Sequence, residues 1–201
     1  EQGNEIEEYA RLLFPDGVLV KSKGIQAKHE TDGLVESGVV TIFQATAITE
    51  SGLFAMADII TFNKNTQTWT LYEVKSTNSI KKEHLYDTAF QRATFEEAGY
   101  KIGKVGVIHL DKDYVRASSV DPDKLLIQTD VSTKVDEILP IIKQQASDAL
   151  KLIRQTQEPK GCSCRLKTKS GHCPTFHYLN PDIPEYSVFD ISRIGNKNLA
   201  I

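Results

Sequence analysis

Two carboxylates and a lysine lie near one another along the chain, Asp58 in an apolar run and Glu73 and Lys75 in the segment Glu73-Val74-Lys75. A solvated acid is less expected inside such an apolar stretch than in a polar loop. Carboxylate oxygens that converge on one point are the ligands that Mg2+ and Mn2+ prefer. Such an ion lowers the pKa of a bound water, and a neighbouring lysine stabilises negative charge on a phosphodiester. The pattern predicts metal-assisted hydrolysis, with Asp58 and Glu73 as ligands and Lys75 as a catalytic residue.

Two strands joined by a turn must position these residues. The polar segment 63–68 has turn chemistry, and the runs on either side of it are rich in β-branched and aromatic residues, which favours a β-hairpin. A turn centred in the middle of this segment pairs Phe62 with Trp69 and places Asp58 directly opposite Glu73. The two acids are therefore predicted to be neighbours across the hairpin.

Opposed carboxylates repel each other, because residues that face each other across a hairpin have Cβ atoms about 5 Å apart. A bound cation offsets that repulsion. The alternation of side chains along a strand puts Lys75 on the same face as Glu73 and turns the Val74 side chain away. The Val74 carbonyl is a further candidate metal ligand. The alternative is that Asp58, Glu73 and Lys75 are solvated polar residues of an ordinary two-stranded ribbon.

A helix predicted after the hairpin, over residues 80–98, carries a second set of candidate residues. His84, Asp87, Gln91 and Phe95 share one stripe of that helix, because residues three and four apart are neighbours on a helix. If the stripe faces the metal, Gln91 orients a phosphate or a water and Phe95 stacks against a base. If it faces solvent, these are ordinary surface residues, which is the interpretation we favour for His84 and Asp87.

The order of these residues resembles a known family. Asp58, then the segment 73–75, then the helical pattern Asp87-x-x-x-Gln91-x-x-x-Phe95 is similar to the PD-(D/E)XK nuclease superfamily in its RecB-like branch. That branch has a tyrosine where this chain has Phe95, so a role that depends on a hydroxyl group is lost. The resemblance implies that Asp58, Glu73 and the Val74 carbonyl bind metal and that Lys75 and Gln91 assist catalysis.

Both ends of the chain extend the resemblance. Residues 3–15 are similar to the first helix of the RecB-like branch, and residues 161–174 are similar to its C-terminal cysteine cluster, as in CRISPR-associated RecB-like exonucleases. The resemblance implies an α/β (α+β), restriction-endonuclease-like core at 1–157, with a central mixed β-sheet flanked by helices. A small cysteine-containing lobe at 158–201 would pack on this core. The implied activity is hydrolysis of DNA with Mg2+ or Mn2+, with an exonuclease on single-stranded or frayed ends favoured.

The third metal ligand is less well determined. RecB-like nucleases carry a metal-binding histidine in the first helix, and counting from Gly3 its position is occupied here by Glu7, with Glu8 beside it. Either carboxylate can serve as a ligand. Acids in a first helical turn also interact favourably with the helix dipole without any catalytic role, so both interpretations stay open.

All three cysteines, Cys162, Cys164 and Cys173, lie within twelve residues. Such clustering favours a shared metal over three separate thiols, and disulfides are not expected without a secretion signal. His172 or His177 would complete a Cys3His zinc site. The resemblance implies instead a 4Fe-4S cluster whose fourth cysteine precedes the first helix, and the sequence contains no such cysteine. Three unligated thiols are the remaining alternative.

The net charge of −3 provides no general attraction for nucleic acid, so DNA must be held by a local patch and by metal. The densest basic run surrounds the cysteines, and it is predicted to contact DNA phosphates. It consists of Lys160, Arg165, Lys167 and Lys169. A second hypothesis is a catalytically degenerate module that binds nucleic acid and carries a structural metal.

No run of about 18 apolar residues is present, which excludes a membrane-spanning helix by sequence, and the acidic start does not resemble a signal peptide. A cytoplasmic protein is therefore expected. The chain begins at Glu1 within what looks like a motif, so we expect a fragment or a processed form. The hydrophobic pattern predicts the following elements. Helices are expected at 4–14, 80–98 and 135–157, and strands at 18–20, 39–48, 54–62, 69–74, 104–110 and 125–128.

Overall fold

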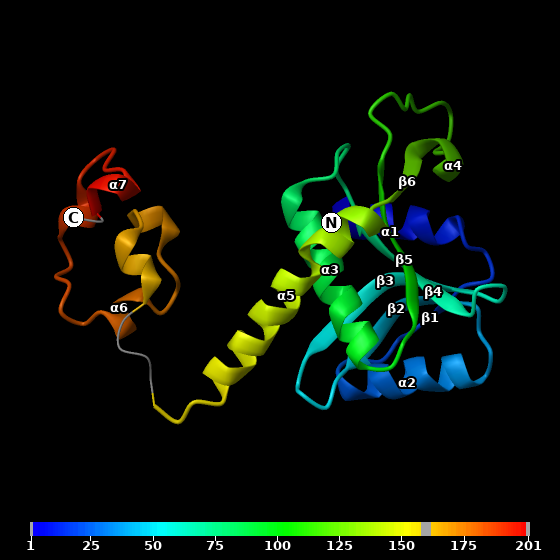
Figure 1. Ribbon diagram of the computed structural model, residues 1–201. Helices are drawn as coiled ribbons and strands as arrows, with labels where there is room; N and C mark the ends of the chain where they lie inside the picture. The colour runs from blue at the N-terminus through cyan, green and yellow to red at the C-terminus, as the bar shows by residue number, and fades with distance from the viewer. Residues whose placement is uncertain (1, 158–161, 200–201) are drawn as a thin grey trace. The chain divides into compact units, whose positions relative to one another are not determined.

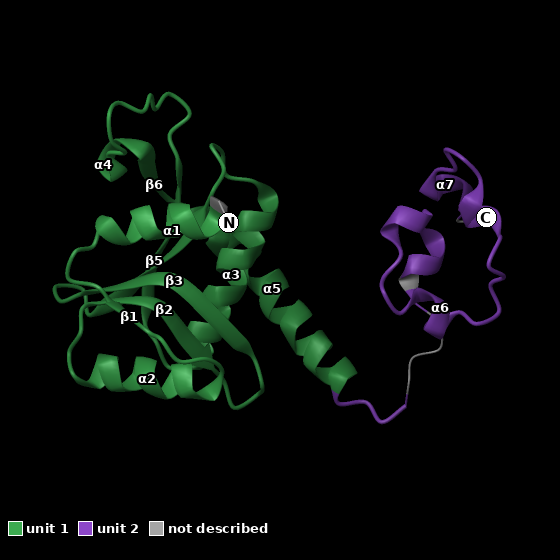
Figure 2. Ribbon diagram, turned by 180° about the vertical axis from the view of Figure 1, so that it is seen from behind, with its two compact units in different colours: residues 1–153 green, residues 154–201 purple. Residues whose placement is uncertain are grey.

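We describe a computed structural model of the chain, in which residues 2–157 and 162–199 are described. The chain divides into two compact units, residues 1–153 and residues 154–201 (Figure 2). The predicted packing of the C-terminal lobe on the core stays a prediction.

A six-stranded mixed sheet forms the centre of the first unit (Figure 1). Strand order follows chain order, β1 to β6. The β1–β2 and β4–β5 pairs are parallel, and the other neighbouring pairs are antiparallel. The strands are β1 (Val18–Leu19), β2 (Thr41–Ile48), β3 (Phe54–Asn63), β4 (Thr68–Lys75), β5 (Ile102–Leu110) and β6 (Leu126–Asp130).

Helices cover both faces of this sheet, which confirms the predicted α+β arrangement of a mixed sheet flanked by helices. The helices are α1 (Gln2–Leu12), α2 (Ile25–Glu36), α3 (Lys82–Glu97), the short α4 (Pro122–Leu125) and α5 (Ser132–Ile153). Helix α3 connects β4 to its parallel neighbour β5 and lies beside α5 (Figure 1). One apolar cluster joins the sheet to α2, α3 and α5, and a second cluster joins it to α1.

The register of the β3–β4 hairpin is the predicted one. Phe62 pairs with Trp69, and the ladder continues in the same register to Ile59 and Tyr72. Asp58 and Glu73 are the next positions of the two strands, just past the last ladder pair. The strands separate at this point, which frees the Val74 backbone N–H for the Asp58 carboxylate instead of a strand neighbour.

The alternation of side chains along strand β2 reverses in the middle of the strand, at Gln44. Its neighbours in sequence, Phe43 and Ala45, belong to different apolar clusters on opposite faces of the sheet, whereas a regular strand directs residues two apart to the same face. Gln44 has a left-handed φ of 56°, and this conformation reverses the strand. In β3, Ile59 and Ala57 pair with Phe43 and Ala45 and change faces in the same way.

Helices α2, α4 and α5 differ from the sequence prediction, and the short α4 was not predicted. Helix α2 was not predicted, because its residues are mostly polar and form no clear apolar stripe; it buries only Ala27 and Thr31. Helix α5 ends at Ile153 rather than at residue 157. Its second half extends past α3 (Figure 1), and among its residues only Val135 and Ile142 are buried.

The second unit consists of short helical turns around a few aromatic rings. The rings of His172 and Phe176 stack with centroids 3.5 Å apart, and Phe189 packs edge-on against both. The turns are η1 (Ser163–Leu166), η2 (Lys169–Gly171), α6 (Phe176–Leu179), η3 (Val188–Asp190) and α7 (Asn196–Leu199).

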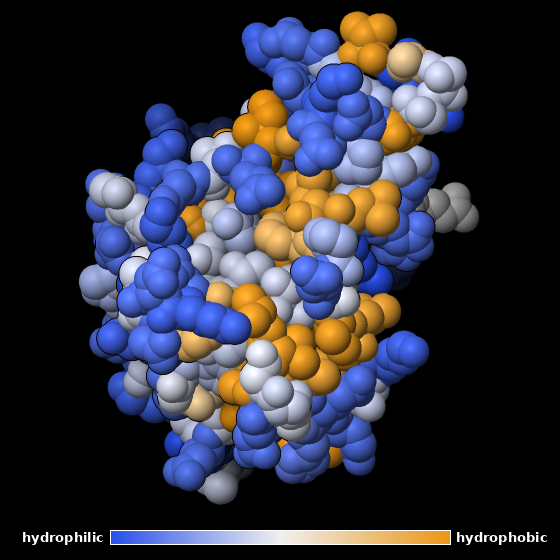
Figure 3. All heavy atoms as spheres, turned by 90° about the vertical axis from the view of Figure 1, so that its right-hand side faces the viewer, coloured by the Kyte–Doolittle hydropathy of each residue, from blue (hydrophilic) through white to orange (hydrophobic). Residues whose placement is uncertain are grey.

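The face in Figure 3 carries many hydrophilic residues with hydrophobic areas between them. Among the described residues, no helix combines the length and apolar character needed to span a membrane.

Candidate functional site

Glu73 lies at the centre of the candidate site, at the end of β4. Its Oε1 accepts a 2.8 Å contact from Lys75 Nζ, and its Oε2 accepts a 2.6 Å hydrogen bond from Gln91 Nε2 of α3. Lys75 also contacts Asp87 Oδ2 at 3.0 Å. The stripe of α3 that carries Asp87 and Gln91 therefore faces the hairpin, and these residues meet the strand residues as the active-site interpretation requires.

Lys75 keeps its positive charge in this environment. Burial by itself lowers the pKa of its ammonium group, but hydrogen bonds and charge interactions with Glu73 and Asp87 outweigh burial and raise the pKa above its usual value. A lysine that stays protonated cannot take a proton from water. What a charged lysine can do chemically in such a site is stabilise negative charge or orient an oxygen.

Asp58 is mostly buried, and its two oxygens have separate partners. Oδ2 accepts a 2.7 Å hydrogen bond from the Val74 backbone nitrogen, and Oδ1 accepts a 3.1 Å bond from Gln44 Nε2. Burial first, and then the nearby charge of Glu73, raise the pKa of Asp58 to about 7. Val74 thus enters the site through its N–H, and metal binding by its carbonyl stays a prediction.

Glu7, rather than Glu8, belongs to this site. Glu7 Oε1 accepts a 2.6 Å hydrogen bond from Gln44 Nε2 and also contacts Arg11 one helical turn later. Glu8 is exposed on α1. The proposal of Glu8 as a ligand is therefore wrong for this arrangement, because its position on the helix directs it away from Asp58.

Gln44 is a site residue that the sequence reasoning missed. One nitrogen of its side chain contacts carboxylates from two different elements, Glu7 on α1 and Asp58 on β3. A signal was present in the sequence, because Gln44 is an amide in the middle of a predicted apolar strand. That signal does not reveal its partners, since they depend on how α1 packs against the sheet.

Two other residues of the α3 stripe have structural roles. Phe95 has no exposed surface and packs edge-on against Tyr100. The predicted stacking of Phe95 on a base is therefore wrong, because the stripe faces the core at that level of the helix. His84 is also buried, and its Nδ1 accepts a hydrogen bond from the Lys81 backbone nitrogen at the start of α3.

The oxygen donors fit a hard cation in type, although the acids do not form a tight group. Among the described residues, only the cysteines form a group of three or more candidate ligands whose donor atoms lie within 4.8 Å of one another. One polar atom at the site lacks a partner: the Oε1 of Gln91 is buried without a hydrogen bond. Buried acceptors are normally paired, so the Oε1 of Gln91 can accept a hydrogen bond from a donor such as water.

The second candidate site is the cysteine cluster of the C-terminal unit. The sulfur atoms of Cys162, Cys164 and Cys173 lie within 4.8 Å of one another, and those of Cys162 and Cys173 are 3.9 Å apart. A hydrogen bond with Thr175 is the main cause of a lowered pKa at Cys173. Thiolates are the form of cysteine that binds metal. Three convergent sulfurs therefore can bind a metal ion.

Neither predicted histidine joins the cysteines. His172 Nε2 lies 3.0 Å from the Lys167 carbonyl, and its ring stacks on Phe176. His177 packs edge-on against the same phenyl ring. Within the described ranges, the group of convergent ligand atoms contains only the three cysteines. The Cys3His expectation is therefore wrong for this arrangement, because the aromatic packing of the unit uses both imidazole rings.

The basic run of this unit is less available for DNA than predicted. Arg165 Nη2 pairs with Asp182 at 2.6 Å, and Lys169 Nζ pairs with Asp190 at 2.5 Å. Lys167 is exposed, and Lys160 lies outside the described residues. Two of the four predicted phosphate contacts are thus already neutralised by carboxylates.

Comparison with known proteins gives no identity for the chain. Its sequence matches no protein-family model, and it matches no curated protein.

Proposed function

We propose that this protein is a metal-dependent nuclease of the RecB-like branch of the PD-(D/E)XK superfamily, which hydrolyses DNA phosphodiester bonds. The observation that supports this most directly is the meeting of Lys75 and Gln91 on the Glu73 carboxylate, with Asp58 at the next position of the paired strand. These contacts on Glu73 favour a catalytic site over a solvated ribbon.

Each residue has a chemical role that its surroundings support. Asp58 and Glu73 would hold Mg2+ or Mn2+, with Glu7 as a third acid; such an ion, when bound, lowers the pKa of a water. Lys75 stays charged and stabilises negative charge on the phosphodiester. Gln91 holds Glu73 through its nitrogen, and its oxygen can accept a hydrogen bond from a water.

A shallow hollow beside Lys75 suits a strand of nucleic acid better than the buried Phe95 does. It is lined by Lys82, Glu83, Tyr86 and Asp87 and has a volume of about 380 Å³. Lys82 Nζ lies 5.3 Å from the centroid of the Tyr86 ring. A base can stack on that ring while the lysine contacts a phosphate, which agrees with a preference for single-stranded or frayed DNA ends.

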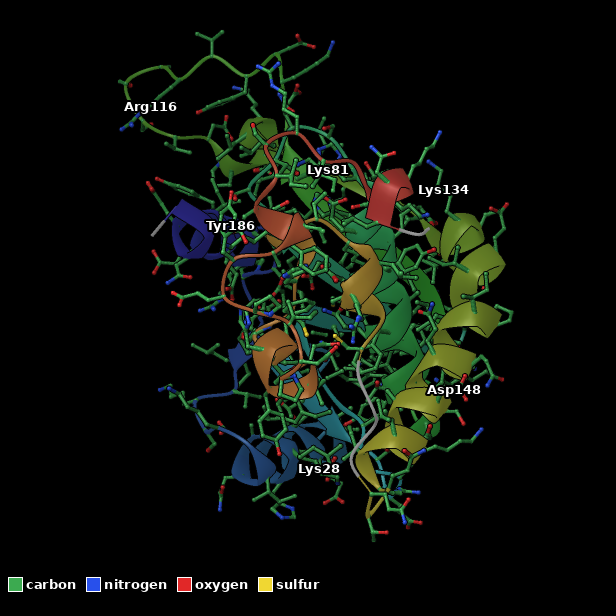
Figure 4. The ribbon with its side chains drawn as sticks, turned by 90° about the vertical axis from the view of Figure 1, so that its left-hand side faces the viewer. Lys28, Lys81, Arg116, Lys134, Asp148 and Tyr186 are labelled. Atoms are coloured by element: carbon green, nitrogen blue, oxygen red, sulfur yellow. The ribbon has the colours of Figure 1, made fainter. Side chains whose placement is uncertain are left out.

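The location of this hollow also favours nucleic-acid binding. Figure 4 shows Lys81 at the start of α3 and Arg116 on the loop after β5, both at the same end of the unit. Lys28 of α2 lies at the other end. Two basic side chains therefore flank the end of the sheet where β4 delivers Lys75, and basic groups there attract phosphates.

The deciding experiment is cleavage of end-labelled single-stranded DNA with and without Mn2+. Lys75→Ala and Glu73→Ala are expected to lose Mn2+-dependent product formation while their circular dichroism spectra match the wild type. Lys64→Ala, an exposed lysine in the hairpin turn, is the control for charge and should cleave normally. Normal cleavage by both active-site variants would refute the proposal.

The same assay tests a second candidate function. All four oxygens of Asp58 and Glu73 have protein donors without any metal, which also suits a catalytically degenerate module that only binds nucleic acid. In that case wild-type protein binds the labelled strand and yields no product with Mn2+ or Mg2+. The cysteine cluster would then serve as a structural metal site.

A further inference from the structure

Gln44 has an unusual backbone conformation for its position. Among the described residues, it is the only one other than glycine that has a positive φ inside a strand; Gln67 and Arg193 lie in turns or loops. Residues with a side chain are strained in this region, and such strain tends to persist at functional sites. The sheet therefore tolerates an unfavourable conformation next to the candidate metal ligands.

The same distortion positions a pair of residues, because Gln44 and Asp58 lie opposite each other. Phe43 pairs with Ile59 and Ala45 pairs with Ala57, so Gln44 and Asp58 are the facing positions between those pairs. At this point the alternation of side chains between the two faces of the sheet reverses in both strands. The reversal of side-chain alternation in β2 and the placement of the Asp58 carboxylate therefore result from the same local distortion.

The side chain of Gln44 links two acids that would otherwise repel each other. Its Nε2 lies 2.6 Å from Glu7 Oε1 and 3.1 Å from Asp58 Oδ1. An amide nitrogen has two hydrogens, and these two contacts use both. Glycine would fit the left-handed backbone better, but it would leave the two carboxylates unconnected.

We propose that Gln44 is the positioning residue of the metal site, which holds Glu7 of α1 beside Asp58 of β3 so that both are in place to bind a divalent cation. This inference rests on the proposed function only in assigning a cation to these acids. Glu7 has a competing partner, Arg11. Without the Gln44 amide, Glu7 is left with Arg11 alone, and Asp58 loses a donor that stabilises its charged form.

The test measures Mn2+ affinity directly, by electron paramagnetic resonance of free Mn2+. Gln44→Met keeps the length of the side chain and removes its hydrogen bonds, and Gln44→Gly relieves the backbone as well. Both variants are expected to bind Mn2+ about 10-fold to 100-fold more weakly, as is typical for groups that orient metal ligands. Melting temperatures establish that each variant is folded, and Gln44→Gly is the variant least liable to misfold.

Gln67 provides matched controls, because it also has a left-handed φ of 55° and lies in the hairpin turn. Gln67→Met and Gln67→Gly should bind Mn2+ like the wild type. Wild-type affinity in both Gln44 variants would overturn the inference, even if the protein cleaves DNA. Absence of Mn2+ binding by the wild type would also overturn it. Mn2+ binding that depends on Gln44 but yields no DNA cleavage would refute the nuclease proposal and support this one.

Discussion

The side-chain nitrogen of Gln91 donates a 2.6 Å hydrogen bond to Oε2 of Glu73, and this contact connects α3 to the end of β4. Both side chains are largely buried, so the bond forms where water competes little. The other oxygen of Glu73 is contacted by Lys75. Glu73 therefore has a fixed orientation, which a metal ligand requires.

Replacing Gln91 should lower activity more than stability. In Gln91→Ala, Glu73 loses a donor and can rotate, so we expect the rate of Mn2+-dependent cleavage to fall about 10-fold to 100-fold. The free energy of unfolding should fall by only about 1–3 kcal/mol. Single-turnover cleavage and urea denaturation measure the two effects. Gln128→Ala, an exposed glutamine on β6, should change neither, and an unchanged rate in Gln91→Ala would contradict the assigned role.

Stability should depend on pH through Asp58. Its pKa is raised to about 7 in the folded protein from 3.8, so the folded state binds a proton more tightly than the unfolded state does. The stabilisation is fully present below pH 4 and is lost as the pH rises to about 7. Asp58→Asn cannot ionise, so between pH 4 and pH 8 it should lose less unfolding free energy than the wild type does, by on the order of 2 kcal/mol.

Urea denaturation of the metal-free protein between pH 4 and pH 8 measures this effect. The unfolding free energy of Asp58→Asn minus that of the wild type should become smaller as the pH falls from 8 to 4. Asp113→Asn, on an exposed loop, serves as the control and should follow the wild type. A pH-independent difference between Asp58→Asn and the wild type would show that the carboxyl group does not titrate in this range.

Tyr86 should bind DNA through its ring. We expect Tyr86→Ala to weaken binding of a fluorescent single-stranded oligonucleotide at least about fivefold, because stacking of one base contributes about 1–3 kcal/mol. Tyr86→Phe keeps the ring and should bind normally. Fluorescence anisotropy in Ca2+, which limits cleavage, gives the affinity. Equal binding by Tyr86→Ala and Tyr86→Phe would exclude the hollow as a base-binding site.

The cysteine cluster should bind metal. Within the C-terminal unit, the only side-chain ligands that we expect are the three cysteine sulfurs. Cys173→Ala is expected to lose the cobalt–thiolate absorption band that appears when Co2+ is added, because two thiolates hold the ion poorly. His172→Ala should retain the band, since its Nε2 already contacts the Lys167 carbonyl. Loss of the band in His172→Ala with the unit still folded would restore the histidine as a ligand.

Much of the site could be predicted because it depends on local rules. Turn chemistry fixes the hairpin register, which pairs Phe62 with Trp69, and alternation then fixes where Glu73 and Lys75 point. Helical spacing places Asp87 and Gln91 on one stripe. By contrast, helix α2 has no clear apolar stripe, and it is stable because β2 offers it a surface to pack on.

The sequence by itself determined the residue types, the hairpin and the stripe of α3, since each follows from contacts between residues close together along the chain. Only the tertiary structure decided that Glu7 and not Glu8 contacts Gln44 beside Asp58, that Phe95 is buried, and that the histidines pack away from the cysteines. Packing between distant segments sets those outcomes. The left-handed conformation at Gln44 is the clearest case. The side chains of two paired strands switch faces of the sheet there, and no local sequence pattern specifies this.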